Sequence, residues 1–520
     1  MNMRIRKNSA QAALLIGLFL VVSAGGAATR DEPLEGQIVV DPEHPQWLIR
    51  HKKGPFFMCG PGDPEGFLYR GMRNPDGTRN GDQMALIRKM AGTGANCIYL
   101  QAVRSHGGDG DRTHNPFVDS DPAKGLDEDI LRQWETWFNA MEAEGIVIYF
   151  FFYDDSARIW NTGDVVGPQE RAFIHGIVNR FEHHRLLIWC IAEEYNERYS
   201  VKRVSNIAAE IRAADDYDHV IAVHQQSGVR FDFADDPNID QFAIQYNQPT
   251  AEALHRGMLA AWKYAAGRYN LNMSEAANHG TGAVMRRKNW ACAMGGAYVM
   301  VLGMDIASTS KADLESCGHL VRFFEQTRFN ETAPHDELAE GATDYVLARP
   351  GSCYILYANG PGPLGVRDLP AGVYDLLWFD PVDGSQEKRT GVELEGGVEF
   401  FSRPATLGAE AALYLVRRTG PVGVRYRRGD ANADSTVDIS DAVCVLSYLF
   451  GSGGDPCKKK VFGCLDSADA NDDGKVDIAD AVALLGHLFA QWGPLPEPFE
   501  RCGTDPTADS LDCTVYPPCS

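Results

Sequence analysis

Two glutamates stand directly after apolar runs that are typical of buried strands, an unexpected place for a charged side chain. Glu194 follows the run 186–191, and Glu275 follows the run 271–273. If both runs are parallel strands of one barrel, both carboxyl groups lie at its mouth. Glycoside hydrolysis needs two carboxyl groups facing one sugar, because one protonates the leaving oxygen while the other attacks the anomeric carbon. The pair therefore indicates hydrolysis of a glycosidic bond.

Other polar or aromatic side chains end the remaining runs or lie near the expected mouth, where a substrate would bind. A lone histidine or tryptophan near a barrel is more often a packing residue than a ligand contact. Asp154 and Asp155 also end a run, but they fit the cap of the next helix equally well. The predicted substrate contacts are Glu193, Tyr246, His224, Arg104, His106 and Trp290.

The elements that must position these side chains alternate between residues 45 and 335. Amphipathic stretches such as 126–144, with apolar residues at helical spacing, separate short and continuously apolar runs. Such runs are typical of parallel strands covered by helices on both faces. We predict an α/β fold, a (β/α)8 barrel; a doubly wound open sheet is the alternative, although no GxGxxG follows the first run. The runs are 56–59, 96–100, 146–152, 186–191, 220–223, 241–245, 271–273 and 297–302.

The strand-end acids resemble those of clan A glycoside hydrolases, in which the acid/base ends strand four and the nucleophile ends strand seven. The resemblance implies that Glu194 is the acid/base, that Glu275 is the nucleophile and that Tyr246 hydrogen-bonds Glu275. Glu193 stands where the clan has asparagine, so it is an alternative acid or raises the pKa of Glu194 by repulsion. We expect a retaining reaction on a polysaccharide or oligosaccharide.

From about residue 340 the pattern changes to short strands punctuated by glycine, proline and aspartate. This pattern is typical of a small antiparallel β-sandwich, which we predict over residues 340–417. The run 56–60 and this sandwich together resemble a group of barrel hydrolases with a C-terminal, collagen-binding-like β domain. A linker is predicted over residues 418–428.

An internal repeat follows, because the segment 430–443 returns as the segment 469–482, an offset of 469 − 430 = 39 residues. Each copy places oxygen donors at loop positions 1, 3, 5, 9 and 12, with a backbone carbonyl from position 7, which is a stagger that wraps Ca²⁺. An Asx-rich turn explains one copy at best. The predicted ligands are Asp430, Asn432, Asp434, Thr436, Asp438 and Asp441, then Asp469, Asn471, Asp473, Lys475, Asp477 and Asp480.

The repeat resembles type I dockerin modules over residues 429–492. The resemblance implies a small α-helical module that holds two Ca²⁺ ions and docks a cohesin-like protein or another cell-surface partner. Gly474 makes the sharp turn at position 6 of the second loop, whereas the first loop has Ser435. The serine must take a positive φ at some energetic cost. A cysteine-rich tail over residues 493–520 exceeds a minimal dockerin.

The N-terminus reads as an export signal over residues 1–28, with a basic start, an apolar run of secretory length and small residues for cleavage. A membrane anchor is the alternative, but the run is short for a membrane-spanning helix, which needs roughly 20 residues. We expect a secreted or extracellular chain, or one that is periplasmic or associated with the cell surface. The cysteine distribution fits export: six of the 12 crowd the last 80 residues or so, which indicates disulfides, and six scattered ones fit free core thiols.

Charge and motifs exclude several other classes. The 49 basic and 71 acidic residues give a net charge of −22, which argues against a nucleic-acid binder. There is no GxSxG elbow and no HExxH zinc helix. Two alternatives to the glycoside hydrolase stay open. One is a non-catalytic carbohydrate-binding or scaffold protein with a docking tail, and the other is a metal-dependent hydrolase using His106, Asp154 and His224.

Overall fold

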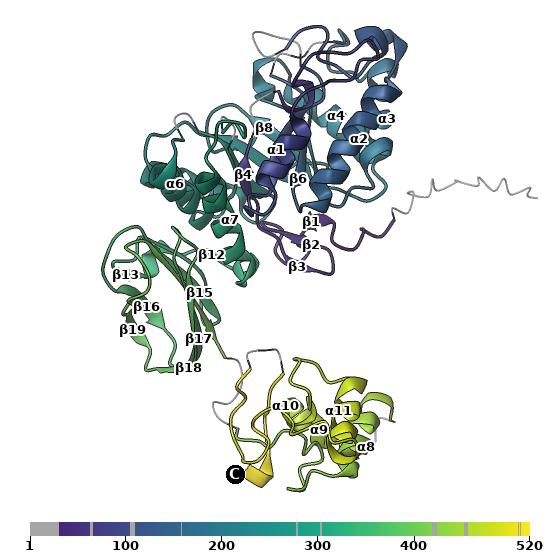
Figure 1. Ribbon diagram of the computed structural model, residues 1–520. Helices are drawn as coiled ribbons and strands as arrows, with labels where there is room; N and C mark the ends of the chain where they lie inside the picture. The colour runs from purple at the N-terminus through teal and green to yellow at the C-terminus, as the bar shows by residue number, and fades with distance from the viewer. Residues whose placement is uncertain are drawn as a thin grey trace, which may run out of the picture.

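The computed structural model describes residues 31–62, 66–104, 110–155, 157, 159–276, 279–301, 304–418, 424–451, 456–507, 509 and 511–519. The predicted signal peptide and His106 lie outside these residues. Figure 1 shows three parts in chain order, which are a helix-covered barrel, a pair of β-sheets and a small helical module.

Eight parallel strands of the described chain form a nearly closed barrel, which confirms the predicted parallel α/β fold. From β5 to β11 each strand pairs with the next along the chain, and β11 returns to β4. This order rules out the doubly wound sheet, whose strand order reverses at a switch point. The strands are β4 Cys59–Pro61, β5 Cys97–Gln101, β6 Val147–Tyr153, β7 Leu187–Ala192, β8 Ile221–Gln225, β9 Gln241–Gln245, β10 Asn270–Glu275 and β11 Tyr298–Val301.

Strands β4 and β5 meet across the last gap of the barrel. The backbone N–H of Asn96 donates to the carbonyl of Cys59 at 3.1 Å, and the Asn96 side chain accepts from the Cys59 N–H at 2.9 Å. A Cβ on Gly60 would lie 2.8 Å from the backbone nitrogen of Cys97, so only glycine allows this approach. Asn96 and Gly60 therefore hold the two ends of the sheet together.

Helices cover the outside of the barrel and bury its apolar strands. Helix α2 shows the predicted stripe at helical spacing, because its Trp134, Phe138 and Met141 are all buried. The N-cap aspartate of α2, Asp127, accepts from the backbone N–H of Asp129, which fixes where the helix begins. The helices are α1 Gln83–Met90, α2 Glu128–Ala143, α3 Pro168–Phe181, α4 Val201–Ala214, α5 Ala251–Ala265, α6 Gly282–Met294 and α7 Lys311–Glu325.

A small antiparallel sheet covers the amino end of the barrel. It consists of β1 Ile38–Val40, β2 Leu48–Arg50 and β3 Gly54–Pro55. Its Ile38 N–H donates to the carbonyl of Arg185 just before β7, and its Leu48 N–H donates to the hydroxyl of Tyr298 at the start of β11. Because this end is covered, the carboxyl ends of the strands form the mouth.

Two antiparallel sheets follow the barrel and share one apolar core, to which Tyr354, Trp378 and Leu413 of the larger sheet and Val366 of the smaller sheet contribute. The opposite face of the larger sheet packs on the helices of the barrel. The larger sheet holds β12 Ala333–Pro334, β14 Tyr345–Arg349, β15 Cys353–Ala358, β20 Ala411–Arg417, β17 Gly372–Phe379 and β18 Gln386–Leu394. The smaller holds β13 Ala339–Gly341, β16 Leu364–Leu369 and β19 Gly397–Phe401.

The C-terminal module consists of α8 Ile439–Phe450, α9 Pro456–Gly463, α10 Leu465–Ala468 and α11 Ile478–Phe489. The predicted disulfides are present, and the six scattered cysteines are free and buried. Within the described residues, the chain has no helix with the length and apolar character needed to span a membrane. The disulfides are Cys444–Cys457, Cys464–Cys513 and Cys502–Cys519.

Candidate active site

Glu194 and Glu275 meet at the mouth of the barrel, as the sequence predicts. They lie at the carboxyl ends of β7 and β10, Gln245 Nε2 donates to Glu194 Oε1, and the negative charge of Glu275 acts on the Glu194 carboxyl. Both glutamates are partly exposed, with the Glu275 side chain 25% exposed. The two carboxyl groups are therefore both accessible to solvent at the mouth of the barrel.

A β-bulge in β10 brings Glu275 to this point. Met273 pairs with Ile244, but Glu275 pairs with Gln245, so Ser274 is the extra residue. Side chains alternate between the two faces of a strand, so without the bulge Glu275 would point outward with Leu271 and Met273. The bulge turns the carboxylate to the barrel interior, beside the inward-facing Gln245.

The prediction that Tyr246 hydrogen-bonds Glu275 through its side chain is wrong. Only the backbone N–H of Tyr246 makes contact, donating to the carbonyl of Glu275 at 2.8 Å. The ring of Tyr246 packs over Gly257 of α5, where a Cβ would come within 2.2 Å of it. The alternation of β9 sends residue 246 outward and residue 245 inward, so the amide of Gln245 fills the predicted position.

The environment of Glu194 favours its protonated form. Burial, then the negative charges of Glu275 and Glu197, raises the pKa of the Glu194 carboxyl to about 8. Gln226 donates from Nε2 to Glu194 Oε2 at 2.9 Å and to Glu197 Oε1 at 2.7 Å, which ties these two groups together. A carboxylic acid that keeps its proton near neutral pH is suited to be a general acid.

Glu275 has the character of the partner carboxylate. Burial raises its pKa, the hydrogen bond from Gln245 lowers it, and the charge of Asp155 raises it again. In Glu194, by contrast, the charges of Glu275 and Glu197 add to the effect of burial and raise the pKa to about 8. This difference suits Glu194 to the protonated position and Glu275 to the ionised position of a two-carboxyl reaction.

His224 positions both glutamates from beneath. The backbone N–H of Glu194 donates to His224 Nδ1 at 3.0 Å, and His224 Nε2 lies 3.8 Å from Glu275 Oε2. Burial lowers the pKa of His224 to about 3, so the ring is neutral and carries its proton on Nε2. Because its side chain is fully buried, the predicted sugar contact is corrected to a positioning role.

The backbone of Glu194 is held in an unusual conformation. Its φ is 37° and its ψ is 48°, in the left-handed region that costs about 1–2 kcal/mol for a residue with a side chain. The hydrogen bond to His224 Nδ1 holds this turn, which leads into the short helical turn Tyr195–Glu197. Strain of this kind at a strand end is characteristic of functional residues.

The remaining predicted contacts lie deeper in the barrel. Glu193 is 5% exposed and accepts a hydrogen bond from the Gln101 amide of β5, and one of its carboxylate oxygens lies within 4.8 Å of Glu275 and His224. Arg104 is 2% exposed, with its backbone N–H donating to the His114 carbonyl. Both residues are therefore interior groups of the site, and Glu194 is the better-placed acid.

The prediction that Trp290 stacks on sugar is wrong. It lies on α6, is fully buried, and stacks on Tyr357 of β15 with ring centroids 4.9 Å apart. Phe323 of α7 and Phe379 of β17 close the same contact, with centroids at 5.3 and 6.4 Å. Trp290 therefore joins the barrel to the larger antiparallel sheet.

This role makes Trp290→Ala a stability variant. Losing a fully buried tryptophan leaves a cavity, and we expect a loss of about 3–5 kcal/mol in the free energy of unfolding. Thermal unfolding followed by circular dichroism measures the change. Trp492→Ala, at a side chain that is 67% exposed, is the matched control and should change little. Equal losses in both variants would contradict the assigned packing.

The raised pKa of Glu194 sets the alkaline limit of activity. The acid is protonated below about pH 8, so kcat/KM should fall as pH rises through about 8, while the ionisation of Glu275 sets the acidic limb above its usual 4.5. Glu197→Gln removes one negative neighbour, so the alkaline limb should move to lower pH. A pH profile of both proteins measures this; an unmoved limb would refute the coupling.

Gln245, Gln226 and Glu197 are site residues that the sequence analysis did not identify. Glutamine carries no charge, so it does not stand out in the sequence as a catalytic carboxylate does. Only the alternation of side chains along the run 241–245 could have indicated that Gln245 faces the barrel interior. Glu197 stands within the acidic segment after β7 and has a helical spacing of three residues from Glu194.

The two repeat loops share one pattern of backbone hydrogen bonds. In each loop the position-12 aspartate, Asp441 or Asp480, accepts from the backbone N–H at positions 3 and 9 and is fully buried. Burial, with like charges nearby, raises the pKa of each of these carboxyls to about 7. Ser435 has a φ of 76° and Gly474 one of 80°, so the serine does take the predicted left-handed turn. The two copies therefore fold in the same way.

The barrel is similar to known proteins in sequence and in fold. Residues 52–297 match the family model described as "Apiosidase-like, catalytic domain". No curated protein matches the chain. A solved structure described as "Glycoside hydrolase" has a TM-score of 0.54 at 15% identity, covering 75% of this chain and 98% of that one. A family 5 glycoside hydrolase from Bacteroides vulgatus ATCC 8482 has a TM-score of 0.55 at 15% identity, covering 75% and 95%.

At this identity the solved structures show a shared fold, whereas the family model describes a catalytic domain. The matched residues 52–297 contain both glutamates and the glutamine between them. The barrel is therefore the catalytic domain of a glycosidase, and this chain is an enzyme of the glycoside hydrolase class.

Proposed function

We propose that this chain is a secreted, retaining glycoside hydrolase that acts on a polysaccharide or oligosaccharide and carries a calcium-binding docking module. In the proposed reaction Glu194 protonates the leaving oxygen while Glu275 attacks the anomeric carbon. Glu194, now ionised, then takes a proton from the water that releases the sugar from Glu275. The observation that carries the proposal is the pair of carboxyls at the mouth of the barrel, where the charge of Glu275 raises the pKa of Glu194 and His224 contacts both residues.

The closeness of the two carboxyls supports retention over inversion. The charge of Glu275 is the largest charge effect on the pKa of Glu194, which requires the two groups to lie near one another. Retaining enzymes hold their carboxyl groups roughly 5–5.5 Å apart, whereas inverting enzymes leave roughly 6.5–9.5 Å for a water molecule. A close pair of carboxyls therefore favours direct attack by Glu275. The anomeric configuration of the first product, followed by NMR, tests this: an inverted product would refute it.

The substrate is proposed from the family name and tested by a screen. The matched family model is named for apiosidases, so glycans with terminal apiosyl groups belong in the panel with common plant and algal polysaccharides. Release of reducing sugar is measured for the full chain and for Glu275→Gln. A glycan hydrolysed by the parent and not by the variant supports the proposal. Binding without any hydrolysis would favour the non-catalytic carbohydrate-binding alternative.

The C-terminal module is proposed to bind two Ca²⁺ ions and to dock a cohesin-like protein. Its helices α8 and α11 expose equivalent apolar residues at the 39-residue offset, which suits two related docking faces. Apolar side chains that are about half exposed or more, and that recur at the same positions, indicate an interaction surface. The pairs, with their exposed fractions, are Ile439 54% and Ile478 58%, Val443 57% and Val482 48%, and Phe450 74% and Phe489 68%.

Binding to a recombinant cohesin tests the docking proposal. We expect the full chain to bind in the presence of Ca²⁺ and to lose binding in a chelator. The double variant Val443→Asp with Val482→Asp charges both faces and should abolish binding without affecting hydrolysis. Val382→Asp, at a 48% exposed valine of the β-sheet part, is the matched control. Failure of the parent to bind any cohesin tested would remove this partner and leave the catalytic proposal intact.

A further inference from the structure

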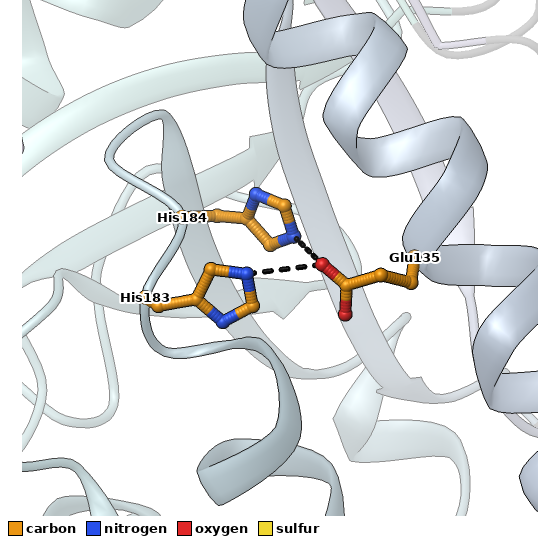
Figure 2. A group of neighbouring side chains, drawn as sticks. All are labelled: Glu135, His183 and His184. Atoms are coloured by element: carbon orange, nitrogen blue, oxygen red, sulfur yellow. Dashed lines mark hydrogen bonds and ion pairs between the residues drawn. The ribbon is translucent and has the colours of Figure 1, made fainter.

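Three metal-binding side chains converge on the closed end of the barrel, away from the catalytic mouth. Figure 2 shows Glu135 of α2 pointing toward His183 and His184, which lie in the segment before β7. Glu135 Oε1 is 3.0 Å from His183 Nε2 and 3.3 Å from His184 Nε2. The three ligand atoms all lie within 4.8 Å of one another.

The second nitrogen of His184 fixes which atom faces the cluster. Its Nδ1 lies 2.9 Å from Glu142 Oε2, so Nδ1 carries a proton that it donates to this carboxylate. In a neutral ring, Nε2 then has a lone pair and no proton. A histidine held by a carboxylate through one nitrogen is the usual arrangement of a metal ligand that binds through the other.

The Nε2 of His184 has no hydrogen bond within the described part of the chain, although its side chain is only 1% exposed. It faces Glu135 Oε1 at 3.3 Å, so a nitrogen and an oxygen that can both bind a metal ion lie side by side. Arg180 lies 3.4 Å from the other oxygen of Glu135, Oε2, so it does not occupy this gap. A buried nitrogen that makes no hydrogen bond and lies beside a carboxylate oxygen is suited to hold a cation together with that oxygen.

We propose that Glu135, His183 and His184 bind a Zn²⁺ ion. Zinc takes imidazole nitrogen and carboxylate oxygen at about 2.0–2.2 Å in tetrahedral geometry, which places its ligand atoms roughly 3.3 Å apart. The contacts of 3.0 and 3.3 Å already match this spacing. Imidazole ligands select zinc and similar metals over calcium, which prefers oxygen.

The ion would join two elements that are separate in the sequence. It would connect α2 to the segment that leads into β7, the strand that ends beside Glu194. Because β7 is six residues long, the metal lies roughly 20 Å from the catalytic carboxyls. The His183 side chain is 52% exposed, so solvent can reach the fourth coordination position. The proposed role is a structural one.

Zinc titration by calorimetry tests the site, using the full chain with excess Ca²⁺ to saturate the repeat loops. We expect one Zn²⁺ per chain, and at least a 100-fold weaker affinity in His183→Ala and in Glu135→Gln. Glu142→Gln keeps all three ligands and should weaken binding 10–100-fold, because only the support of His184 is lost. Zinc should also raise the melting temperature of the parent and not that of His183→Ala.

His175→Ala is the matched control, since His175 makes a comparable surface contact with Glu210 at 3.1 Å on neighbouring helices. It should bind Zn²⁺ like the parent. No zinc binding by the parent, or equal binding by the parent and His183→Ala, would overturn the proposal. NMR that shows both nitrogens of His184 protonated in zinc-treated protein would do the same, because an imidazolium bridging two carboxylates then replaces the metal.

Discussion

Glu275→Gln should lower kcat by on the order of 10⁴-fold or more, because the amide cannot attack the anomeric carbon. Glu194→Gln should lower kcat by roughly 10²–10⁴-fold on a natural glycan, because the leaving oxygen then departs without a proton. Activated aryl glycosides separate the two roles. Their leaving groups need no proton, so Glu194→Gln should recover much of its first step, whereas Glu275→Gln should stay inactive.

Two matched variants at the same mouth sharpen this comparison. Glu197→Gln removes a carboxylate beside Glu194 and should keep hydrolysis, with only its pH profile altered. Glu193→Gln tests the neighbouring acid, which is buried below the mouth. If Glu193→Gln, and not Glu194→Gln, shows the dependence on the leaving group, the acid role belongs to Glu193. Circular dichroism of each variant confirms that it is folded.

Removal of Ca²⁺ should unfold the C-terminal module and leave the barrel active. Asp430 and Asp441 are fully buried in the first loop, as Asp480 is in the second, so without a cation their like charges face one another. Both long helices start from these loops, with Asp438 and Asp477 as their N-caps. A ligand at about 1,000 times its Kd contributes about 4.1 kcal/mol at each site.

Limited proteolysis of the full chain, with and without a chelator, measures this loss. We expect cleavage within residues 424–519 only after chelation, with hydrolysis of a soluble glycan unchanged. Asp441→Asn and Asp480→Asn should each reduce the number of bound Ca²⁺ ions by one. Asp235→Asn, at an exposed residue of the barrel, is the control. Protection of the module that does not depend on calcium would contradict the metal assignment.

The sequence predicted the barrel and the position of Glu194 and Glu275 at its mouth because buried parallel strands are continuously apolar. β9 spans Gln241–Gln245 as expected, and the other runs differ from the strands by a few residues at their ends. Those differences matter little for the fold. They matter more for the site, because one residue along a strand turns a side chain to the opposite face.

Tyr246 shows this limit most clearly. The sequence run ends beside both Gln245 and Tyr246, and nothing in the residue types says which one faces inward. The bulge at Ser274 also cannot be predicted from the residue types, although it decides where Glu275 points. The site therefore follows from strand register, which is fixed by packing between strands and not by local pattern.

Polar strands and buried aromatic residues were the other sources of error. β18, Gln386–Leu394, is an edge strand with charged residues and little apolar alternation, so no strand was predicted there. Trp290 was assigned to substrate because tryptophan stacks on sugars, but the same ring also fills the contact between α6 and the larger sheet. Residue type alone does not distinguish these two uses.

Covalent trapping on Glu275 tests the central claim most directly. The full chain is incubated with a 2-deoxy-2-fluoro glycoside of the sugar found in the screen, in which the fluorine slows release of the glycosyl-enzyme. Peptide mass spectrometry then locates the added sugar. We expect it on the peptide that contains Glu275, with trapping lost in Glu275→Gln and retained in Glu197→Gln. An adduct on Glu193 or Glu194, or steady turnover with inversion and no adduct, would contradict the mechanism.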